Sequence, residues 1–292
     1  MDPTQEEGLI IKNFSGFYYV QDNNDQIYEC KIRGKVKDKV MSGDRVRFTR
    51  LEEGRGILEK VLPRQNQLDR PRVANVTRVL IVMACDQPKP DLTLLDRLLF
   101  LSLFNRITPY IILNKCDLPM DRSAESIISY YPATFRVFLT SARQGIGLEA
   151  LSQAIVDQIA VFAGPSGAGK SSLLKMLNGE SRVVTQEVSS KIGRGRHTTR
   201  HVELYTLSPG GWIVDTPGFS VLDMPSLRRE ETADYFPDFS AYKSECRFNN
   251  CLHYKEQECG VRAAVSNQSI LPSRYQNYVA MLEEIIAKER NY

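Results

Sequence analysis

The sequence contains no hydrophobic run that approaches the length of a transmembrane helix, and it has no internal repeat or low-complexity tract. Charge of one sign is not in large excess either, because the formal net charge is only +3 over 292 residues. A balance this mild does not identify a nucleic-acid-binding protein by itself. With 42% hydrophobic and 25% charged residues, the composition is that of soluble globular domains, and we expect a cytoplasmic protein.

The strongest single motif is a phosphate-binding loop of the pattern G-x-x-x-x-G-K-[ST]. It lies between an apolar run at 160–163, predicted as a strand, and a helical segment at 171–177. Glycine lets backbone N–H groups turn towards the phosphates, and the helix N-terminus adds its positive dipole end. Lys170 is expected to reach the β- and γ-phosphates, and Ser171 to bind Mg²⁺. The predicted phosphate-binding residues are Gly164, Pro165, Ser166, Gly167, Ala168, Gly169, Lys170, Ser171 and Ser172.

A second motif, Asn114-Lys115-Cys116-Asp117, is typical of guanine recognition. It follows the apolar run 110–113, and a further apolar run at 135–139 leads into Thr140-Ser141-Ala142, so both motifs end predicted strands. Asp117 can accept hydrogen bonds from the guanine N1–H and exocyclic amine, which adenine does not present, and this selects GTP over ATP. We expect Asn114 to brace the loops around the base and Lys115 to cover the ring face. The Ser141 and Ala142 backbone is expected to meet guanine O6.

Two switch segments are predicted between and after these elements. Residues 191–201 form a basic, glycine-containing loop, in which the hydroxyl of Thr198 or Thr199 is expected to complete the Mg²⁺ shell. The sequence Asp215-Thr216-Pro217-Gly218 closes a predicted strand at 211–214. Asp215 is expected to hold Mg²⁺ through water, and the Gly218 N–H to sense the γ-phosphate.

The glutamine that orients water in many GTPases is missing after this motif. Phe219 occupies its place and can neither donate nor accept a hydrogen bond, which predicts slow intrinsic hydrolysis. His197 is the best local candidate for positioning or deprotonating water, since a neutral imidazole titrates near physiological pH. The alternative is an exposed loop histidine that contacts a partner.

The order of the motifs narrows the function further. The guanine motif at 114–117 precedes the phosphate loop at 164–171, whereas an ordinary G domain has the opposite order. This order predicts a circularly permuted P-loop GTPase domain. Its new C-terminal end falls just after residue 218, so the segment that follows is attached directly to a nucleotide-sensitive motif.

Histidine and cysteine are scarce, yet they gather near the C-terminus. Three of the six cysteines and one of the three histidines lie within fourteen residues, as Cys246, Cys251, His253 and Cys259. We predict a structural Cys₃His zinc site, because four protein ligands leave no open coordination position. A disulfide is disfavoured because an intracellular nucleotide enzyme lies in a reducing compartment. Unligated thiols remain the alternative, since the spacing is not that of a common zinc finger.

The N-terminal region alternates short β-rich runs with turn-forming residues, which predicts about five strands in a small OB-fold barrel. Phe14, Phe17, Tyr18 and Tyr19 are candidates for stacking on bases, although aromatic residues in strands more often belong to a core. We predict an OB-fold RNA-binding domain at 1–65, a permuted GTPase domain at 66–225 and a helical zinc-binding domain at 226–292. Polar residues 64–71 are expected to link the first two.

The motifs together resemble the family of ribosome small subunit-dependent GTPase A, which are circularly permuted bacterial ribosome-biogenesis GTPases. The resemblance spans the chain and includes the Gly193-to-Arg200 loop, Phe219 and the Cys/His cluster. It implies binding of GTP-loaded protein to the small ribosomal subunit and its rRNA late in maturation, hydrolysis stimulated by the subunit, and then release. It also maps the switch histidine onto His197. A local departure is the polar lead-in at 157–160.

Two alternatives stay open at this point. In the first, the chain is a GTP-gated RNA-binding module whose hydrolysis is incidental, and in the second it is a G protein that acts on the large subunit or on another RNA. The expected partners are GTP, GDP and the small subunit with its rRNA, with no membrane, and a monomer is expected.

Overall fold

The computed structural model describes residues 5–32, 34, 39–52, 54–69, 71–178, 202–214 and 223–290. Within them the chain forms two compact units. One contains Met1–Val79, Leu148–Phe162 and Ser171–Ser220, and the other contains Leu80–Gly147, Ala163–Lys170 and Val221–Tyr292. The domain boundaries predicted at residues 65 and 225 stay a prediction. Among the described residues, no helix is long and apolar enough to cross a membrane.

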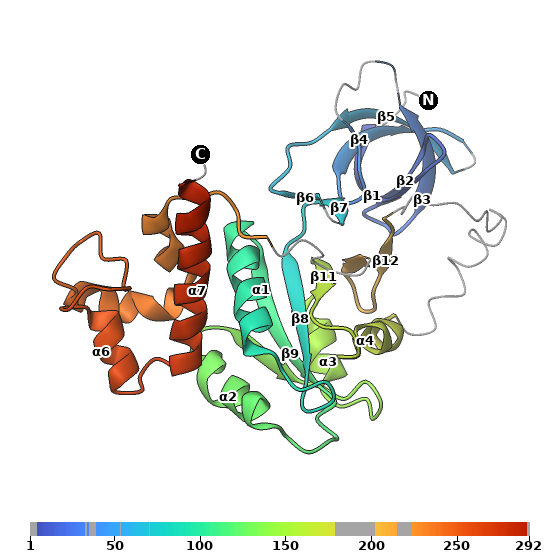
Figure 1. Cartoon of the computed structure of the whole chain (residues 1–292). Helices are drawn as coiled ribbons and strands as arrows, with labels where there is room; N and C mark the ends of the chain where they lie inside the picture. Colours follow the sequence, from blue (N-terminus) through green and yellow to red (C-terminus); the bar gives the residue numbers. More distant parts are fainter. Residues whose placement is uncertain are drawn as a thin grey trace. The chain divides into compact units, whose positions relative to one another are not determined.

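The first unit begins with a closed five-stranded barrel of order β1-β2-β3-β5-β4 (Figure 1). Neighbouring strands are antiparallel except for β3 and β5, which are parallel. This closure confirms the predicted barrel, and it leaves no unpaired sheet edge. The strands are β1 (Gln5–Phe14), β2 (Phe17–Asp22), β3 (Ile27–Ile32), β4 (Arg45–Arg50) and β5 (Arg55–Val61).

The barrel interior follows from alternation along the strands. In β4, for example, Val46 and Phe48 are fully buried while Arg45 and Arg47 face outwards. Gly56 is needed in β5, since a Cβ there would lie 2.6 Å from the Cys30 sulfur. The buried core consists of Ile10, Val20, Tyr28, Cys30, Val40, Val46, Phe48, Leu58 and Val61.

The segment predicted as a polar linker has more structure than its composition suggests. It contains a short antiparallel pair, β6 (Gln67–Asp69) and β7 (Arg72–Ala74). Arg64 donates to both carboxylate oxygens of buried Asp44, at 2.6 and 2.9 Å. The Asn75 side chain donates to the Gly43 carbonyl oxygen at 2.8 Å. The segment after the barrel is therefore fastened to the barrel by these contacts.

A six-stranded sheet has the order β10-β9-β8-β11-β13-β12. Its strands β8 (Arg78–Ala84), β9 (Thr108–Asn114) and β11 (Ile159–Ala163) are almost wholly buried apolar runs, as is typical of parallel strands covered on both faces. Strand β10 (Arg136–Leu139) pairs in parallel with β9. The short strands β12 (Leu204–Thr206) and β13 (Trp212–Val214) form an antiparallel hairpin.

Four helices alternate with these strands: α1 (Leu92–Phe104), α2 (Arg122–Tyr130), α3 (Leu148–Ala154) and α4 (Lys170–Leu177). Asp91 caps α1 by accepting hydrogen bonds from the Thr93 and Leu94 N–H groups. Asp121 caps α2 in the same way through the Ser123 N–H. The alternation of strand and helix is that of an α/β domain, as predicted.

The C-terminal region is helical. It contains the 3₁₀ helices η3 (Arg229–Tyr235) and η4 (Pro237–Glu245), and then α6 (Gly260–Ser266) and α7 (Pro272–Glu289). A further 3₁₀ helix, η1 (Tyr131–Ala133), follows α2 in the sheet domain. Helix α7 packs along α1 within the second unit (Figure 1).

A buried ionic cluster lies where α7 meets α1 and η4. Arg274 is only 1% exposed and donates to Asp96 Oδ1 at 2.7 Å and to both Asp238 oxygens at 2.9 and 3.1 Å. Its guanidinium also lies 4.4 Å from the Phe236 ring centroid. Asp96 accepts two further hydrogen bonds, from the Tyr131 hydroxyl and the Asn277 amide. Every charge in the cluster thus has partners, which burial requires.

Candidate nucleotide site and metal centre

Asn114 joins three loops that are far apart in the sequence. Its amide nitrogen donates to the Ala168 carbonyl oxygen in the phosphate loop at 3.0 Å. Its amide oxygen accepts from the Thr140 hydroxyl and from the Ala142 N–H, both at 3.2 Å. The side chain is 2% exposed, so these bonds are made away from water. The two predicted base-side loops and the phosphate loop are therefore brought together by one side chain.

Asp117 lies beside the second base-side loop. The Ser141 hydroxyl donates to Asp117 Oδ1 at 2.6 Å, and this hydrogen bond lowers the pKa of the carboxyl. The group is therefore an ionised acceptor at neutral pH, which is the form that pairs with two N–H donors of a base. Lys115 has a positive φ of 62°, and its ammonium donates to the Gln87 carbonyl oxygen.

Two glycines of the phosphate loop are required by close approach as well as by positive φ. A Cβ on Gly164, whose φ is 120°, would lie 2.1 Å from the Val82 carbonyl oxygen. A Cβ on Gly169, whose φ is 99°, would lie 2.2 Å from the Asn114 amide nitrogen. No side chain fits at either position without displacing the neighbour. The backbone of the phosphate loop at Gly169 consequently packs directly against the Asn114 side chain of the guanine motif.

Lys170 begins helix α4 at the end of this loop. Its ammonium donates to the carbonyl oxygens of Gly164 and Pro165 at 2.8 and 2.6 Å, which holds the charge over the loop. Burial lowers the pKa of this ammonium. Ser171 and Ser172 follow in the first turn of the helix and are exposed. Ser166 and Gly167 are exposed as well, and Ala168 is buried.

Several predicted residues lie outside the part of the chain that the structure describes. They are His197, Thr198, Thr199, Asp215, Gly218 and Phe219.

The predicted metal ligands lie together. The ligand atoms of Cys246, Cys251, His253 and Cys259 are all within 4.8 Å of one another, so the group could hold a metal ion. The His253 Nδ1 atom lies 3.4 Å from the sulfur of Cys246 and 3.4 Å from that of Cys259, and these two sulfurs are 3.9 Å apart. A tetrahedral zinc with bonds of about 2.3 Å to sulfur and about 2.0 Å to nitrogen has edges of about 3.8 and 3.5 Å. The donor set and its dimensions therefore fit such an ion.

The backbone around this cluster is fixed by neighbouring side chains. The Tyr275 and Tyr278 hydroxyls donate to the carbonyl oxygens of His253 and Leu252 at 2.8 and 2.6 Å. Glu256 accepts backbone hydrogen bonds from three residues of the same turn. His253 itself is 2% exposed and has a φ of 54°. Burial raises the pKa of the Cys251 thiol to about 12, so ionising this sulfur at neutral pH requires a nearby cation.

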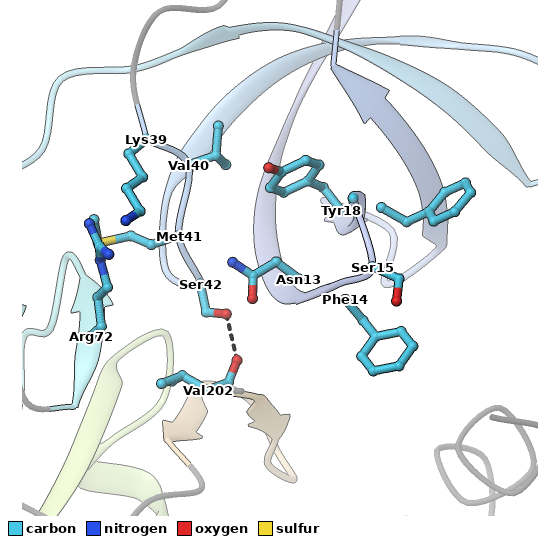
Figure 2. Close-up of a pocket in the computed structure, with 12 residues that line it drawn as sticks. Asn13, Phe14, Ser15, Tyr18, Lys39, Val40, Met41, Ser42, Arg72 and Val202 are labelled. Carbon is cyan, nitrogen blue, oxygen red and sulfur yellow. Dashed lines mark hydrogen bonds between the residues drawn. The ribbon is translucent and has the colours of Figure 1, made fainter. Parts of the chain in front are cut away.

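A cavity of about 380 Å³ opens on the barrel between the β1–β2 turn and residues 39–42 (Figure 2). Phe14, Phe17 and Tyr18 line it, each of them half-buried, together with the cationic side chains of Lys39 and Arg72. The predicted base-stacking aromatics therefore belong neither wholly to the core nor wholly to the surface, although Tyr18 also packs against the core.

Sequence reasoning did not identify the Arg274 cluster, nor the hydrogen bond of 2.7 Å that the Trp212 indole N–H donates to the Gln21 amide oxygen. Asp96 gave a signal, as the one carboxylate in the largely apolar helical stretch at 92–104. Its partners Arg274 and Asn277 lie 178 and 181 residues away along the chain, and no local pattern connects them with Asp96. Gln21 gave no signal, since a glutamine in a strand is usually solvated.

A guanine motif that precedes the phosphate loop in the chain, and that is bonded to this loop through Asn114, defines a circularly permuted P-loop GTPase. The comparison with known proteins narrows this class. The chain belongs to the RsgA GTPase family, whose family model matches residues 61–225, and the model of the RsgA N-terminal domain matches residues 7–58. It is therefore a GTP hydrolase.

Similar proteins extend over nearly the whole chain. The "Small ribosomal subunit biogenesis GTPase RsgA" of Moorella thermoacetica is 44% identical over 289 residues, which is 98% of this chain and 99% of the relative. The protein of the same name from Carboxydothermus hydrogenoformans is 44% identical over 290 residues, with the same coverage. The crystal structure of YjeQ from Thermotoga maritima has a TM-score of 0.84 at 34% identity, covering 97% of this chain and 99% of that one. The structure of YloQ, described as a circularly permuted GTPase, has a TM-score of 0.82 at 35% identity, covering 98% and 96%.

Proposed function

We propose that the protein hydrolyses GTP during late maturation of the small ribosomal subunit, that the subunit stimulates hydrolysis, and that hydrolysis leads to release. The observation that carries the proposal is the Asn114 junction between the guanine motif and the phosphate loop, in the permuted order. Relatives that cover 98% of the chain are named for biogenesis of this subunit. The protein is proposed to act in the cytoplasm, as a monomer.

In this proposal, one set of residues binds the guanine base and another binds the phosphates. Asp117 pairs with guanine, Lys115 covers the ring face, and the Ser141 and Ala142 backbone meets O6. The loop from Gly164 to Ser172 surrounds the phosphates, with Lys170 moving from its carbonyl partners to the β- and γ-phosphates. The low pKa of Asp117 supports its role, because a protonated carboxyl would lose an acceptor.

Hydrolysis requires residues on both switch segments. Ser171 and Asp215 would hold Mg²⁺, with a hydroxyl from Thr198 or Thr199, and this ion neutralises charge on the β- and γ-phosphate oxygens when bound. The Gly218 N–H contacts the γ-phosphate, and His197 orients or deprotonates the attacking water. Replacement of His197 by alanine should lower subunit-stimulated turnover much more than GTP affinity, and equal losses in both would assign it a binding role instead.

The Cys/His cluster is proposed to hold one structural zinc ion. The donor atoms of all four residues lie within 4.8 Å of one another, and the surrounding tyrosine and Glu256 hydrogen bonds keep this turn in place. All four positions are protein donors, so the ion supports the fold and takes no part in the reaction.

The barrel is proposed to bind rRNA. Its cavity combines aromatic surfaces for stacking with two cations suited to phosphate, which is how single-stranded nucleic acid is commonly bound on OB folds. Such contacts explain how a protein with a net charge of only +3 binds RNA, because the cations are placed locally at the cavity.

Co-sedimentation with purified ribosomal subunits tests the proposal. We expect the protein to pellet with small subunits in the presence of a non-hydrolysable GTP analogue and to stay in the supernatant with GDP. Large subunits serve as the control and should retain little protein with either nucleotide. Equal binding to both subunits, or binding that is indifferent to the nucleotide, would contradict the proposed function.

A further inference from the structure

The hairpin β12–β13 connects the two predicted switch segments along the chain. Its first strand follows directly after the 191–201 loop, and its second strand ends at Val214, next to Asp215. The two strands pair in register from Leu204 with Val214 to Thr206 with Trp212. The position of this hairpin therefore sets where both switch segments begin.

The barrel holds the two residues before the first strand of the hairpin, Val202 and Glu203. The Ser42 hydroxyl donates to the Val202 carbonyl oxygen at 2.6 Å, and both residues are buried (Figure 2). Lys12 in β1 pairs with Glu203 through a backbone bridge and a side-chain ion pair of 3.2 Å. The chain immediately after the switch loop is thus attached to the barrel wall.

The second strand is held by Gln21 in β2. Its amide oxygen accepts from the Trp212 indole N–H at 2.7 Å and, more weakly, from the Thr206 hydroxyl at 3.4 Å. Its amide nitrogen donates to Asp25 Oδ1 at 2.9 Å, which fixes the orientation of the amide. An indole is a donor only, so the glutamine oxygen is the group that must face it.

Gln21 is buried, at 4% exposure, and both the oxygen and the nitrogen of its side-chain amide take part in these hydrogen bonds. Among the described residues, the Gln21 side chain makes its hydrogen bonds to Trp212, Thr206 and Asp25, and to no residue of the hydrophobic barrel core. A buried amide is costly unless it is hydrogen-bonded. The side chain therefore serves the connection to the hairpin more than the barrel itself.

We propose that Gln21 is a positioning residue for GTP hydrolysis, because it holds the hairpin from whose ends both switch segments continue. The inference rests on the proposed function, in which the switch segments contact Mg²⁺, the γ-phosphate and water. It supplies a route by which a partner bound to the barrel changes the rate of hydrolysis without touching the nucleotide.

Four variants test this assignment. Gln21→Met removes the acceptor at similar length, Trp212→Phe removes the donor, and the double variant removes both. Gln26→Met is the matched control, since Gln26 is an exposed barrel glutamine with no side-chain contact to the hairpin. Turnover and KM for GTP are measured without and with saturating small subunits, and circular dichroism confirms the fold.

We expect each single variant to lower kcat about tenfold, as loss of one buried hydrogen bond would, with KM changed less than about twofold. The double variant should be no slower than the single ones, because both act through the same bond. A single-variant kcat equal to that of Gln26→Met, or a double variant about a hundredfold slower, would overturn the proposal.

The fluorescence of Trp212 gives a second readout, because it is the only tryptophan in the chain. Its emission should differ between GDP and a non-hydrolysable GTP analogue in the parent protein, and this difference should be lost in Gln21→Met. A difference of the same size in Gln21→Met would contradict the coupling. If small subunits fail to stimulate the parent protein, the proposed function fails, whereas intrinsic turnover of the same variants still tests Gln21.

Discussion

Asn114 is the residue on which the nucleotide site depends most. Its three hydrogen bonds fix the position of two base-side loops against the phosphate loop. Because Asn114 lies 26 to 54 residues from these partners along the chain, the geometry of the loops depends on non-local contacts more than on local turns. The neighbouring residues Asp117 and Gly169 can each be changed to test a different part of this arrangement.

Replacement of Asp117 by asparagine tests whether this residue selects the guanine base. Asp117→Asn should weaken GTP binding by about a hundredfold or more, since two hydrogen bonds to a charged acceptor are lost. It should favour xanthine nucleotides, whose donor and acceptor pattern matches an amide. Titration with labelled nucleotides measures both, and Asp69→Asn, an exposed change in β6, is the control. Unchanged GTP affinity in Asp117→Asn would remove the base-recognition assignment.

Gly169 tests the packing of the phosphate loop on Asn114. Gly169→Ala places a methyl group 2.2 Å from the Asn114 amide nitrogen, and should reduce GTP affinity by more than about tenfold. Gly16→Ala is the matched control, because Gly16 also has a positive φ, of 83°, but has no atom within 4 Å of the added group. Similar small losses in both variants would show that backbone strain, and not the contact with Asn114, matters.

Among the elements, the segment from Cys246 to Cys259 carries the predicted zinc ligands, and the Tyr275 and Tyr278 hydroxyls of helix α7 bond to its backbone. We expect about one zinc per chain in protein purified without added metal, because closed four-ligand sites bind tightly and couple to folding. Cys251→Ala should lower the zinc content and the melting temperature. Cys30→Ala, a buried cysteine of the barrel, should leave zinc content unchanged. Metal-free protein of normal thermal stability would rule the site out.

The contact between α7 and α1 depends on the Arg274 cluster. Arg274→Met leaves the Asp96 and Asp238 carboxylates buried without their cation, so it should lower the free energy of unfolding by about 3–5 kcal/mol. Arg290→Met, at the exposed end of α7, should change it by less than about 0.5 kcal/mol. Thermal or urea unfolding measures both, and equal stability of the two variants would contradict the structural role of the cluster.

Elements with strong local patterns could be predicted from the sequence. The buried strands β8, β9 and β11 are continuous apolar runs, and the turns after them carry recognisable loops. The barrel strands were visible from alternation between turn residues. Residues 64–71 were expected only to link domains, because a polar composition does not reveal that Arg64 pairs with Asp44 of the barrel. The same limit applies to Gln21, whose partner Trp212 is 191 residues away.

At the scale of the whole molecule, the permutation places functions in an unusual order along the chain. The barrel precedes the guanine motif, and the zinc-binding region follows the second switch segment within a few residues. Both the barrel, through the β12–β13 hairpin, and the C-terminal region, through its covalent attachment, are therefore connected to the predicted switch segments. This organisation suits a protein whose GTP turnover is controlled by a large partner.

GTP turnover with and without purified small subunits tests the central claim most directly. Large subunits and free RNA are measured in parallel, together with Lys170→Ala, which removes the phosphate-loop ammonium. We expect small subunits alone to raise turnover by about tenfold or more, a barrier change of about 1.4 kcal/mol, and Lys170→Ala to be inactive throughout. Equal rates with all additions, or full activity in Lys170→Ala, would contradict the assignment of a GTPase that acts on the small subunit.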